Sequence, residues 1–338
     1  MPEILLEISR GPLTENMIRG DVAVTDAEGA PLFHAGDPYK YTYMRSAAKP
    51  LQALSLLERG AAARFGFSLE EIAVMCSSHN AEDFHTEAVR SILAKIGLDE
   101  SRLKCGASYS YGNPAVTESL IRRGLPKSPL FNNCSGKHSA MLALCVLEGY
   151  GLDDYYLPEH PAQQLIRQTV ADCAGMKKEQ LTVGIDGCGA PVFALPLHNM
   201  AYAYARLLNP HGFGTARAQA AAAVREAMTG FPRMVAGTGE FCTALTTAFE
   251  SSLIGKKGAD GVYCVGLAAP ALGIAVKTED GSLKWISSVV MSVLDQLGVL
   301  SSAQKRALGS FYFQDNLNCR GEKIGQISPV FTLQKTSS

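Results

Sequence analysis

Serine and lysine side chains near the start of this 338-residue sequence are spaced for proton transfer. Ser46 and Lys49 are three positions apart, which on a helix places both side chains on one face. A neutral lysine can take the proton of a serine hydroxyl, and burial or a nearby positive charge lowers the lysine pKa toward that role. Arg45 and a helix N-terminus could supply this charge. The pattern therefore predicts a serine nucleophile with a lysine base, beside backbone N–H groups that could stabilise an oxyanion.

The Ser-x-x-Lys pattern is weak on its own, because short patterns occur by chance and this one also starts at Ser101 and Ser302. An exposed serine with a solvated lysine is the usual explanation of a single match. Two further motifs follow in order, Ser78-x-Asn80 in a polar break and Lys256-x-Gly258 just before an apolar strand. This order is typical of penicillin-recognising serine enzymes and related glutaminases, in which the motifs meet at one cleft. We therefore predict four catalytic residues, with Lys257 as an alternative to the last: Ser46, Lys49, Ser78 and Lys256.

Two glycine-rich turns, 132–138 and 184–191, each contain a cysteine among small residues. Thiolates from separate turns could bind zinc, although the paired Cys-x-x-Cys spacing of structural zinc modules is missing. Lys137 could be a third ligand if it is deprotonated, and Asp186 or His138 could bind the metal or orient its water. A catalytic thiol and a purely structural role remain equal alternatives for Cys134 and Cys188.

The composition narrows the class of partner. The sequence has 31 basic and 32 acidic residues, so no basic excess points to nucleic acid or to a membrane surface. We expect a small-molecule substrate instead. The first residues do not have a signal-peptide pattern, and no window approaches the ~20 apolar residues of a membrane span, so we expect a cytoplasmic protein. The nine scattered cysteines do not suggest a disulfide framework.

The elements that must position these residues are predicted from periodicity, turn residues and caps. Strands are expected at 4–8 and in a hairpin over 18–34, and helices at 46–58, 69–77 and 81–95. Ser46 then lies at a helix N-terminus, and Ser78 lies between two helices. Helices are expected further along the chain, followed by two strands and a last helix: 139–148, 162–174, 216–228, 262–267, 272–277 and 289–297. Strands at both ends predict one α/β (α+β) domain over residues 1–338, with an antiparallel sheet flanked by helices.

Several of these segments resemble the rhizobial-type L-asparaginases, also called class 3 or the asparaginase II family. The resemblance rests on six segments that span nearly the whole chain: 44–50, 77–82, 132–138, 184–191, 236–239 and 256–262. It implies a serine β-lactamase- or glutaminase-like fold, a homodimer, and hydrolysis of L-asparagine to L-aspartate and ammonia. It also implies two serine–lysine tandems, Ser46 with Lys49 and Ser78 with Lys256, and a zinc site at Cys134, Lys137 and Cys188 with Asp186 close by.

Acyl transfer to water is the mechanism that these residues favour. Ser46 would attack the side-chain amide with Lys49 as base, while Ser78 and Lys256 relay protons; Ser78 as nucleophile is the alternative. Four residues are candidates for substrate binding, with Arg45 assigned to the substrate carboxylate: Arg45, Asn80, Asp186 and His138. Two other functions compete, a penicillin-recognising peptidase or β-lactamase, and a non-catalytic protein that binds an amino acid or a metal.

Overall fold

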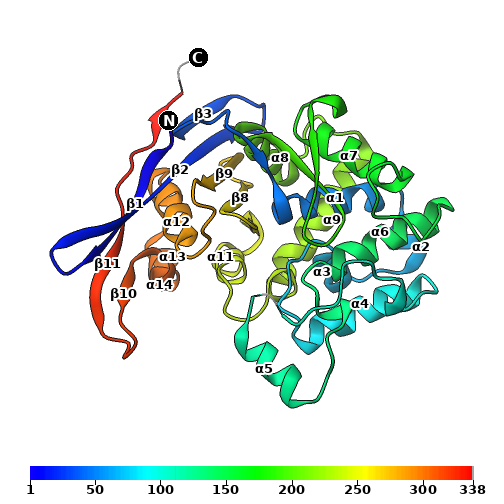
Figure 1. Ribbon diagram of the computed structural model, residues 1–338. Coiled ribbons are helices and arrows are strands. Elements are labelled where there is room, and N and C mark those ends of the chain that lie inside the picture. The colour runs from blue at the N-terminus through cyan, green and yellow to red at the C-terminus, as the bar shows by residue number, and fades with distance from the viewer. Residues whose placement is uncertain (111, 337–338) are drawn as a thin grey trace.

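Strands from both ends of the chain form one large antiparallel sheet, as a computed structural model shows for residues 1–110 and 112–336 (Figure 1). The strand order is β10-β11-β1-β2-β9-β8-β7, and β3 pairs with β2 and with β12. The strands of this sheet are β1 (Glu3–Arg10), β2 (Leu13–Asp26), β3 (Pro31–Ala35), β7 (Leu253–Gly258), β8 (Val262–Leu267), β9 (Leu272–Thr278), β10 (Gln314–Leu317), β11 (Lys323–Pro329) and β12 (Gln334–Lys335). The antiparallel sheet predicted from the sequence is confirmed.

Helices cover both faces of this sheet because its central strands are apolar on both sides. In β2, Val22 and Val24 belong to one buried cluster and Ala23 belongs to the other. On the Ala23 side lies α8 (Leu197–Leu208), which approaches so closely that a Cβ on Gly273 would lie 1.7 Å from the carbonyl oxygen of Ala201. The opposite face is covered by α11 (Phe241–Phe249), α12 (Ile286–Gln296), α13 (Ser302–Ala307) and α14 (Gly309–Tyr312).

The remaining helices pack together on the other side of α8, and the first two motifs predicted to be catalytic lie among them (Figure 1). They are α1 (Lys49–Leu57), α2 (Ala61–Phe65), α3 (Leu69–Met75), α4 (Asp83–Lys95), α5 (Pro114–Arg122), α6 (Ser135–Glu148), α7 (Pro161–Cys173), α9 (Thr215–Gly230) and α10 (Pro232–Val235). Ser68 starts α3 with the predicted capping box, in which its hydroxyl accepts from the Glu71 N–H and the Glu71 carboxylate accepts from the Ser68 N–H.

A second, three-stranded sheet lies beside the helices and ends in one of the cysteine turns. It consists of β4 (Tyr41–Tyr43), β6 (Pro191–Pro196) and β5 (Thr182–Ile185), in that order. The predicted turn at 184–191 is the hairpin between β5 and β6, so Cys188 lies at its tip. Five 3-10 turns complete the described elements: Arg45–Ala48, Glu100–Arg102, Pro129–Phe131, Lys178–Gln180 and Glu250–Ser252.

One sequence prediction about local structure was wrong, and another was incomplete. The segment 132–138 is not only a turn, because α6 already begins at Ser135 and places Lys137 in its first turn. Lys256 does precede the predicted strand 262–267, which is β8, but it also lies inside another strand, β7, whose lysine pair and glycines hide the apolar pattern of a buried strand. Among the described residues, every helix is too short or too polar to cross a bilayer.

Candidate active site

Ser78 lies between the ammonium groups of two buried lysines. Its hydroxyl oxygen is 3.0 Å from Nζ of Lys49, at the start of α1, and 2.8 Å from Nζ of Lys256, on β7. Ser78 follows α3, and its N–H donates to the carbonyl oxygen of Val235 over 2.9 Å, which fixes the backbone at this break. Three segments that are distant in the sequence therefore meet at one hydroxyl group.

Burial, and then the positive charge of Lys49, lowers the pKa of Lys256 to about 7. At neutral pH this lysine is therefore present in both protonation states, and the neutral amine can accept a proton from Ser78. Lys49 has acceptors for all three of its donors, since it also bonds the carbonyl oxygens of Ser77 at 2.7 Å and Asn133 at 3.0 Å. The arrangement suits one charged and one neutral lysine around a single serine.

Ser46 lies in the 3-10 turn that leads into α1, beside this cluster. It lines a cavity of about 260 Å³ together with Ser78, Asn80 and Asn133. Within residues 1–110 and 112–336 its hydroxyl makes no hydrogen bond, and Lys49 bonds Ser78 instead. The structure therefore brings the four predicted catalytic residues to one place, but it pairs both lysines with the second serine.

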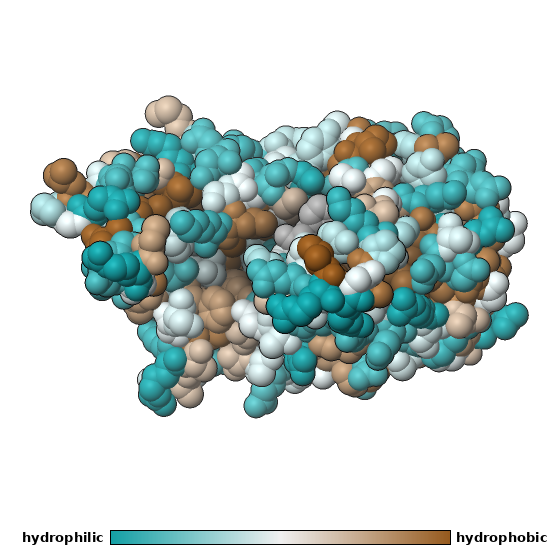
Figure 2. Space-filling model, turned by 60° about the horizontal axis from the view of Figure 1, so that its bottom comes forward, coloured by the Kyte–Doolittle hydropathy of each residue, from teal (hydrophilic) through white to brown (hydrophobic). Residues whose placement is uncertain are grey.

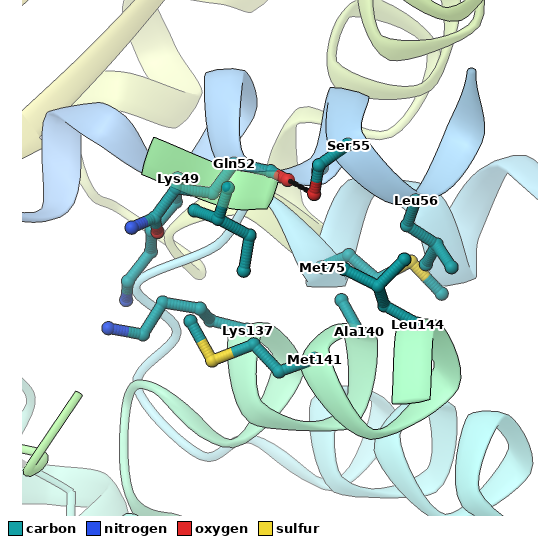
Figure 3. A pocket seen from close by; sticks show the side chains of 11 residues that line it. Lys49, Gln52, Ser55, Leu56, Met75, Lys137, Ala140, Met141 and Leu144 are labelled. Carbon is teal, nitrogen blue, oxygen red and sulfur yellow. Dashed lines mark hydrogen bonds between the residues drawn. The ribbon is translucent and has the colours of Figure 1, made fainter. Parts of the chain in front are cut away.

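Behind Lys49 the structure is closed and apolar. Figure 3 shows that Lys49 on α1 and Lys137 on α6 extend their nitrogen atoms toward the same side, away from Met75 and Leu144. The space between these side chains is only about 10 Å³, which is too small for more than about one water molecule. The stems of both lysines are thus packed between α1 and α6.

Arg45 is held by two carboxylates. Its guanidinium bonds Asp186 at 2.9 Å and also pairs with Asp260, and its backbone adopts the left-handed conformation with φ +50°. Burial acts to raise the pKa of Asp186, but the charges of Lys137 and Arg45 outweigh it and the pKa is lowered. Arg45 would have to exchange one of these partners before it could bind the carboxylate of a substrate.

The two predicted cysteines meet at Lys137. Nζ of Lys137 donates to Sγ of Cys188 over 3.1 Å, and the nearby Cys134 thiol donates to Oδ1 of Asn133 over 3.3 Å. The neighbouring Cys134 side chain, and then the charge of Lys137, lowers the pKa of Cys188 to about 5 against the effect of burial. The neighbouring Cys188 side chain, together with burial, raises the pKa of Cys134 to about 12. Cys188 is therefore a thiolate paired with an ammonium group.

This nitrogen and these two sulfurs fit a zinc ion. Zinc prefers soft thiolate and nitrogen ligands, and the protons of Cys134 and Lys137 would leave as it binds. Among the described residues, no three His, Cys, Asp or Glu side chains come together to hold a metal, so the third donor in this group is a lysine. A second cavity of about 290 Å³ borders the group and shares Ser46 and Asn133 with the first.

The other predicted residues differ in their access to substrate. Asn80 lines the first cavity, and its Oδ1 is buried without a hydrogen-bond partner in the described part of the chain. His138 is fully buried against the Tyr155 hydroxyl at 2.7 Å and is not among the lining residues of either cavity. Burial, and then the charge of Lys137, lowers the pKa of His138 to about 3, so this imidazole is neutral.

Sequence reasoning missed three residues of the site: Asn133, Glu240 and Asp260. Asn133 was inside a quoted motif, and its carbonyl oxygen accepts from Lys49. Glu240 follows a glycine pair, and nothing in the sequence connects it with Ser78. Hydrophilic and hydrophobic residues alternate over the face of the molecule drawn in Figure 2, which is hollowed near its middle.

Comparison with known proteins identifies the family. A comparison with curated proteins finds no match. Among solved structures, a β-lactamase from Mycobacterium bovis is similar at 16% identity and a TM-score of 0.43, covering 82% of this chain and 94% of that chain. A penicillin-binding protein homologue from Pyrococcus abyssi is similar at 12% identity and a TM-score of 0.42, covering 86% of this chain and 76% of that one. The family model described as L-asparaginase II matches residues 6–329. The chain therefore belongs to the L-asparaginase II family, and it is an amidohydrolase of L-asparagine.

Proposed function

We propose that L-asparagine is hydrolysed by acyl transfer on Ser46, while Ser78 and the two lysines move the proton. One observation supports this most strongly: Ser78 Oγ lies within 3.0 Å of both buried lysines, at the wall of the cavity that Ser46 also lines. A hydroxyl between an ammonium group and a neutral amine can pass a proton on without leaving its position. Ser46, with no hydrogen-bond partner among the described residues, is free to approach a carbonyl carbon.

The proposed reaction has two stages, acylation of Ser46 and hydrolysis of the ester. Ser46 Oγ bonds to the side-chain amide carbon, and its proton passes through Ser78 to the neutral Lys256. Lys256 returns the proton to the leaving nitrogen as the C–N bond breaks, so ammonia departs and an aspartyl ester remains on Ser46. Water then attacks the ester and gives its proton to the same relay, which releases L-aspartate and the free hydroxyl. Backbone N–H groups at the 3-10 turn before α1 would stabilise the oxyanion.

Ser78 is a second candidate for the nucleophile, because its hydroxyl and not that of Ser46 is bonded to the lysines. Intact-protein mass spectrometry of Ser46→Ala and Ser78→Ala, quenched during turnover of L-asparagine, separates the two. If Ser46 is acylated, Ser78→Ala still gains the aspartyl mass slowly and Ser46→Ala does not. The reverse pattern would assign the ester to Ser78.

Ammonia release from L-asparagine and from L-glutamine is measured in parallel on the unmodified protein, with a chromogenic β-lactam as control. We expect release from asparagine and a loss of about 10³-fold or more in each serine variant. Release from neither amide, with cleavage of the β-lactam, would favour the peptidase or β-lactamase alternative. Binding of asparagine without any release would favour the non-catalytic one.

The metal that we propose for Cys134, Lys137 and Cys188 is zinc. The hydrogen bond from Lys137 to Cys188, and the effect of the two cysteines on each other's pKa, support this assignment. When bound, zinc would supply a positive charge at the second cavity and would fix its wall. The chain's own residues carry out the proton transfers at Ser78. Asp186 and Arg45 line that cavity and Asn80 lines the first, so we propose these three as substrate contacts, with His138 supporting the wall from behind.

We also propose a cytoplasmic homodimer. All nine cysteines are free, and eight are buried, which suits a reducing compartment. The homodimer rests on the family resemblance of the motif segments. Light scattering of the purified protein should give about twice the 36.1 kDa chain mass, and a mass of one chain would refute it.

A further inference from the structure

The cavity beside the serines contains an ion pair that the proton relay does not use. Of the described residues that line this cavity, Glu240 and Lys257 carry full charges, and they are paired with one another. His79 also lines it, but burial lowers its pKa well below the usual value and leaves it neutral. The pair comes from two elements, since Glu240 precedes α11 and Lys257 lies on β7 next to Lys256.

The pair is exposed enough to exchange partners. The side chains are 19% exposed for Glu240 and 28% for Lys257, so each retains access to the cavity while part of each is packed. Partly exposed ion pairs contribute little free energy on their own, and a ligand with matching charges can replace or extend them at small cost. Arg45 differs, because its guanidinium is shared by two carboxylates, Asp186 and Asp260.

The charges of an α-amino acid match this arrangement. Asparagine carries its ammonium and carboxylate groups on one carbon, a few ångströms apart, and its amide two bonds further on. A neighbouring carboxylate and ammonium in the wall can bind both groups, and this leaves the amide directed at Ser46 and Ser78 in the same cavity. Charge-assisted hydrogen bonds of this kind are stronger than neutral ones and fix orientation.

We propose that Glu240 and Lys257 are specificity residues that bind the two charged groups of the substrate asparagine. Glu240 binds the α-ammonium group and Lys257 binds the α-carboxylate. The inference rests on the proposed function, because it assigns the charged end of the same substrate. It differs from the sequence-based assignment of the carboxylate to Arg45, whose charge is already neutralised by two acids.

Three amides test the proposal, because each releases ammonia and they differ only in charge. L-Asparagine carries both charged groups, succinamic acid lacks the ammonium, and 3-aminopropanamide lacks the carboxylate. Their kcat/KM values are compared in the unmodified protein, in Glu240→Gln, in Lys257→Met and in Arg45→Met. Lys305→Met is the matched control, since Lys305 is also paired with a carboxylate, Asp295, but does not line the cavity.

Each substitution should lower kcat/KM only for the amides that carry the charged group which the replaced side chain binds. Lys257→Met should lose about 10- to 100-fold in kcat/KM for asparagine and succinamic acid and little for 3-aminopropanamide. Glu240→Gln should lose a similar factor for asparagine and 3-aminopropanamide and little for succinamic acid. Lys257→Arg should recover part of the loss, and Lys305→Met should match the unmodified protein on all three.

Two results would overturn the proposal. Equal losses on all three amides would show that the pair only supports the fold, and loss of carboxylate discrimination in Arg45→Met instead of Lys257→Met would move the carboxylate to Arg45. Thermal unfolding of each variant identifies any that fails to fold. If Lys257→Met does not fold, Lys257→Arg and Glu240→Gln test the proposal in its place. If the unmodified protein releases no ammonia from asparagine, the proposed function itself fails, so the two failures are distinguishable.

Discussion

Burial of the Lys256 amine lowers the stability of the fold, but it also prepares this amine to act as a base. Burial and the charge of Lys49 lower its pKa to about 7, whereas in the unfolded chain a lysine has a pKa of about 10.4. Between these two pKa values the unfolded chain binds more protons than the folded chain, so the free energy of unfolding rises as the pH rises from about 7. Below about pH 7 the full cost of burying the charged amine is present. The same deprotonation creates the base, so kcat/KM for asparagine should also rise with pH through about 7.

Lys256→Met separates these demands. The substitution replaces a buried charged side chain by an uncharged one of similar length. Tm at pH 6.5 should therefore rise by roughly 3–6 °C, while ammonia release falls by about 10³-fold or more. At pH 9.5 the gain in Tm should be smaller, because the lysine is then largely neutral in the folded protein. Differential scanning calorimetry at both pH values measures this. A gain that does not depend on pH, or a fall in Tm at both values, would contradict the assigned pKa.

At the scale of elements, Gly237 brings the segment before α11 against Asn80. Its φ is +122°, and a Cβ there would lie 2.2 Å from Nδ2 of Asn80. Gly237→Ala should therefore push the Asn80 amide out of the cavity wall and lower kcat/KM by about 10- to 100-fold. Steady-state kinetics with asparagine checks this.

Gly239→Ala is the matched control for that substitution. Gly239 also has a positive φ, +78°, but a Cβ there would meet nothing within 4 Å. Backbone strain should lower the Tm of both variants, and only Gly237→Ala should lose activity beyond its loss of stability. Equal kinetics in the two variants would show that Asn80 does not need its present position.

At the scale of the whole molecule, the proposed zinc site joins two separate parts. Cys134 lies at the N-terminus of α6 in the helical region, and Cys188 lies at the tip of the β5–β6 hairpin. Removal of zinc by a chelator should therefore lower the Tm of the unmodified protein, with metal content measured by mass spectrometry. Cys188→Ala should bind no zinc and show a Tm that the chelator does not change. Exposed Cys319→Ala should behave as the unmodified protein, and retained zinc in Cys188→Ala would refute the site.

The sequence predicted the elements that have clear local signals, and it placed the reactive residues at their ends. The capping box at Ser68, Pro50 in the first turn of α1 and the hairpin after β2 are such signals. It missed β10 and β11, which are short and polar and become strands because they extend the sheet beyond β1. Tertiary pairing of this kind leaves little trace in local composition.

The sequence predicted which residues gather at the site better than it predicted which of them pair. Spacing suggested that Lys49 serves Ser46, because the two are three residues apart on one helix. In the structure Lys49 instead bonds Ser78, since its long side chain crosses to the end of α3. The Glu240–Lys257 pair likewise depends on how α11 sits against β7, and no spacing rule predicts such a contact.

The position of β7 also bears on how the protein is made. When a ribosome has joined the first 250 residues, both serines and Lys49 are already part of the chain. Strand β7, which carries Lys256, has not yet been synthesised. Among the described strands β7 pairs only with β8, so the proposed base Lys256 reaches the site only after residues 253–267 have paired and docked. Contacts between such distant segments form late in folding. With Lys256 as the base that we propose, the nascent chain would not hydrolyse asparagine until residues 253–267 had been made and paired.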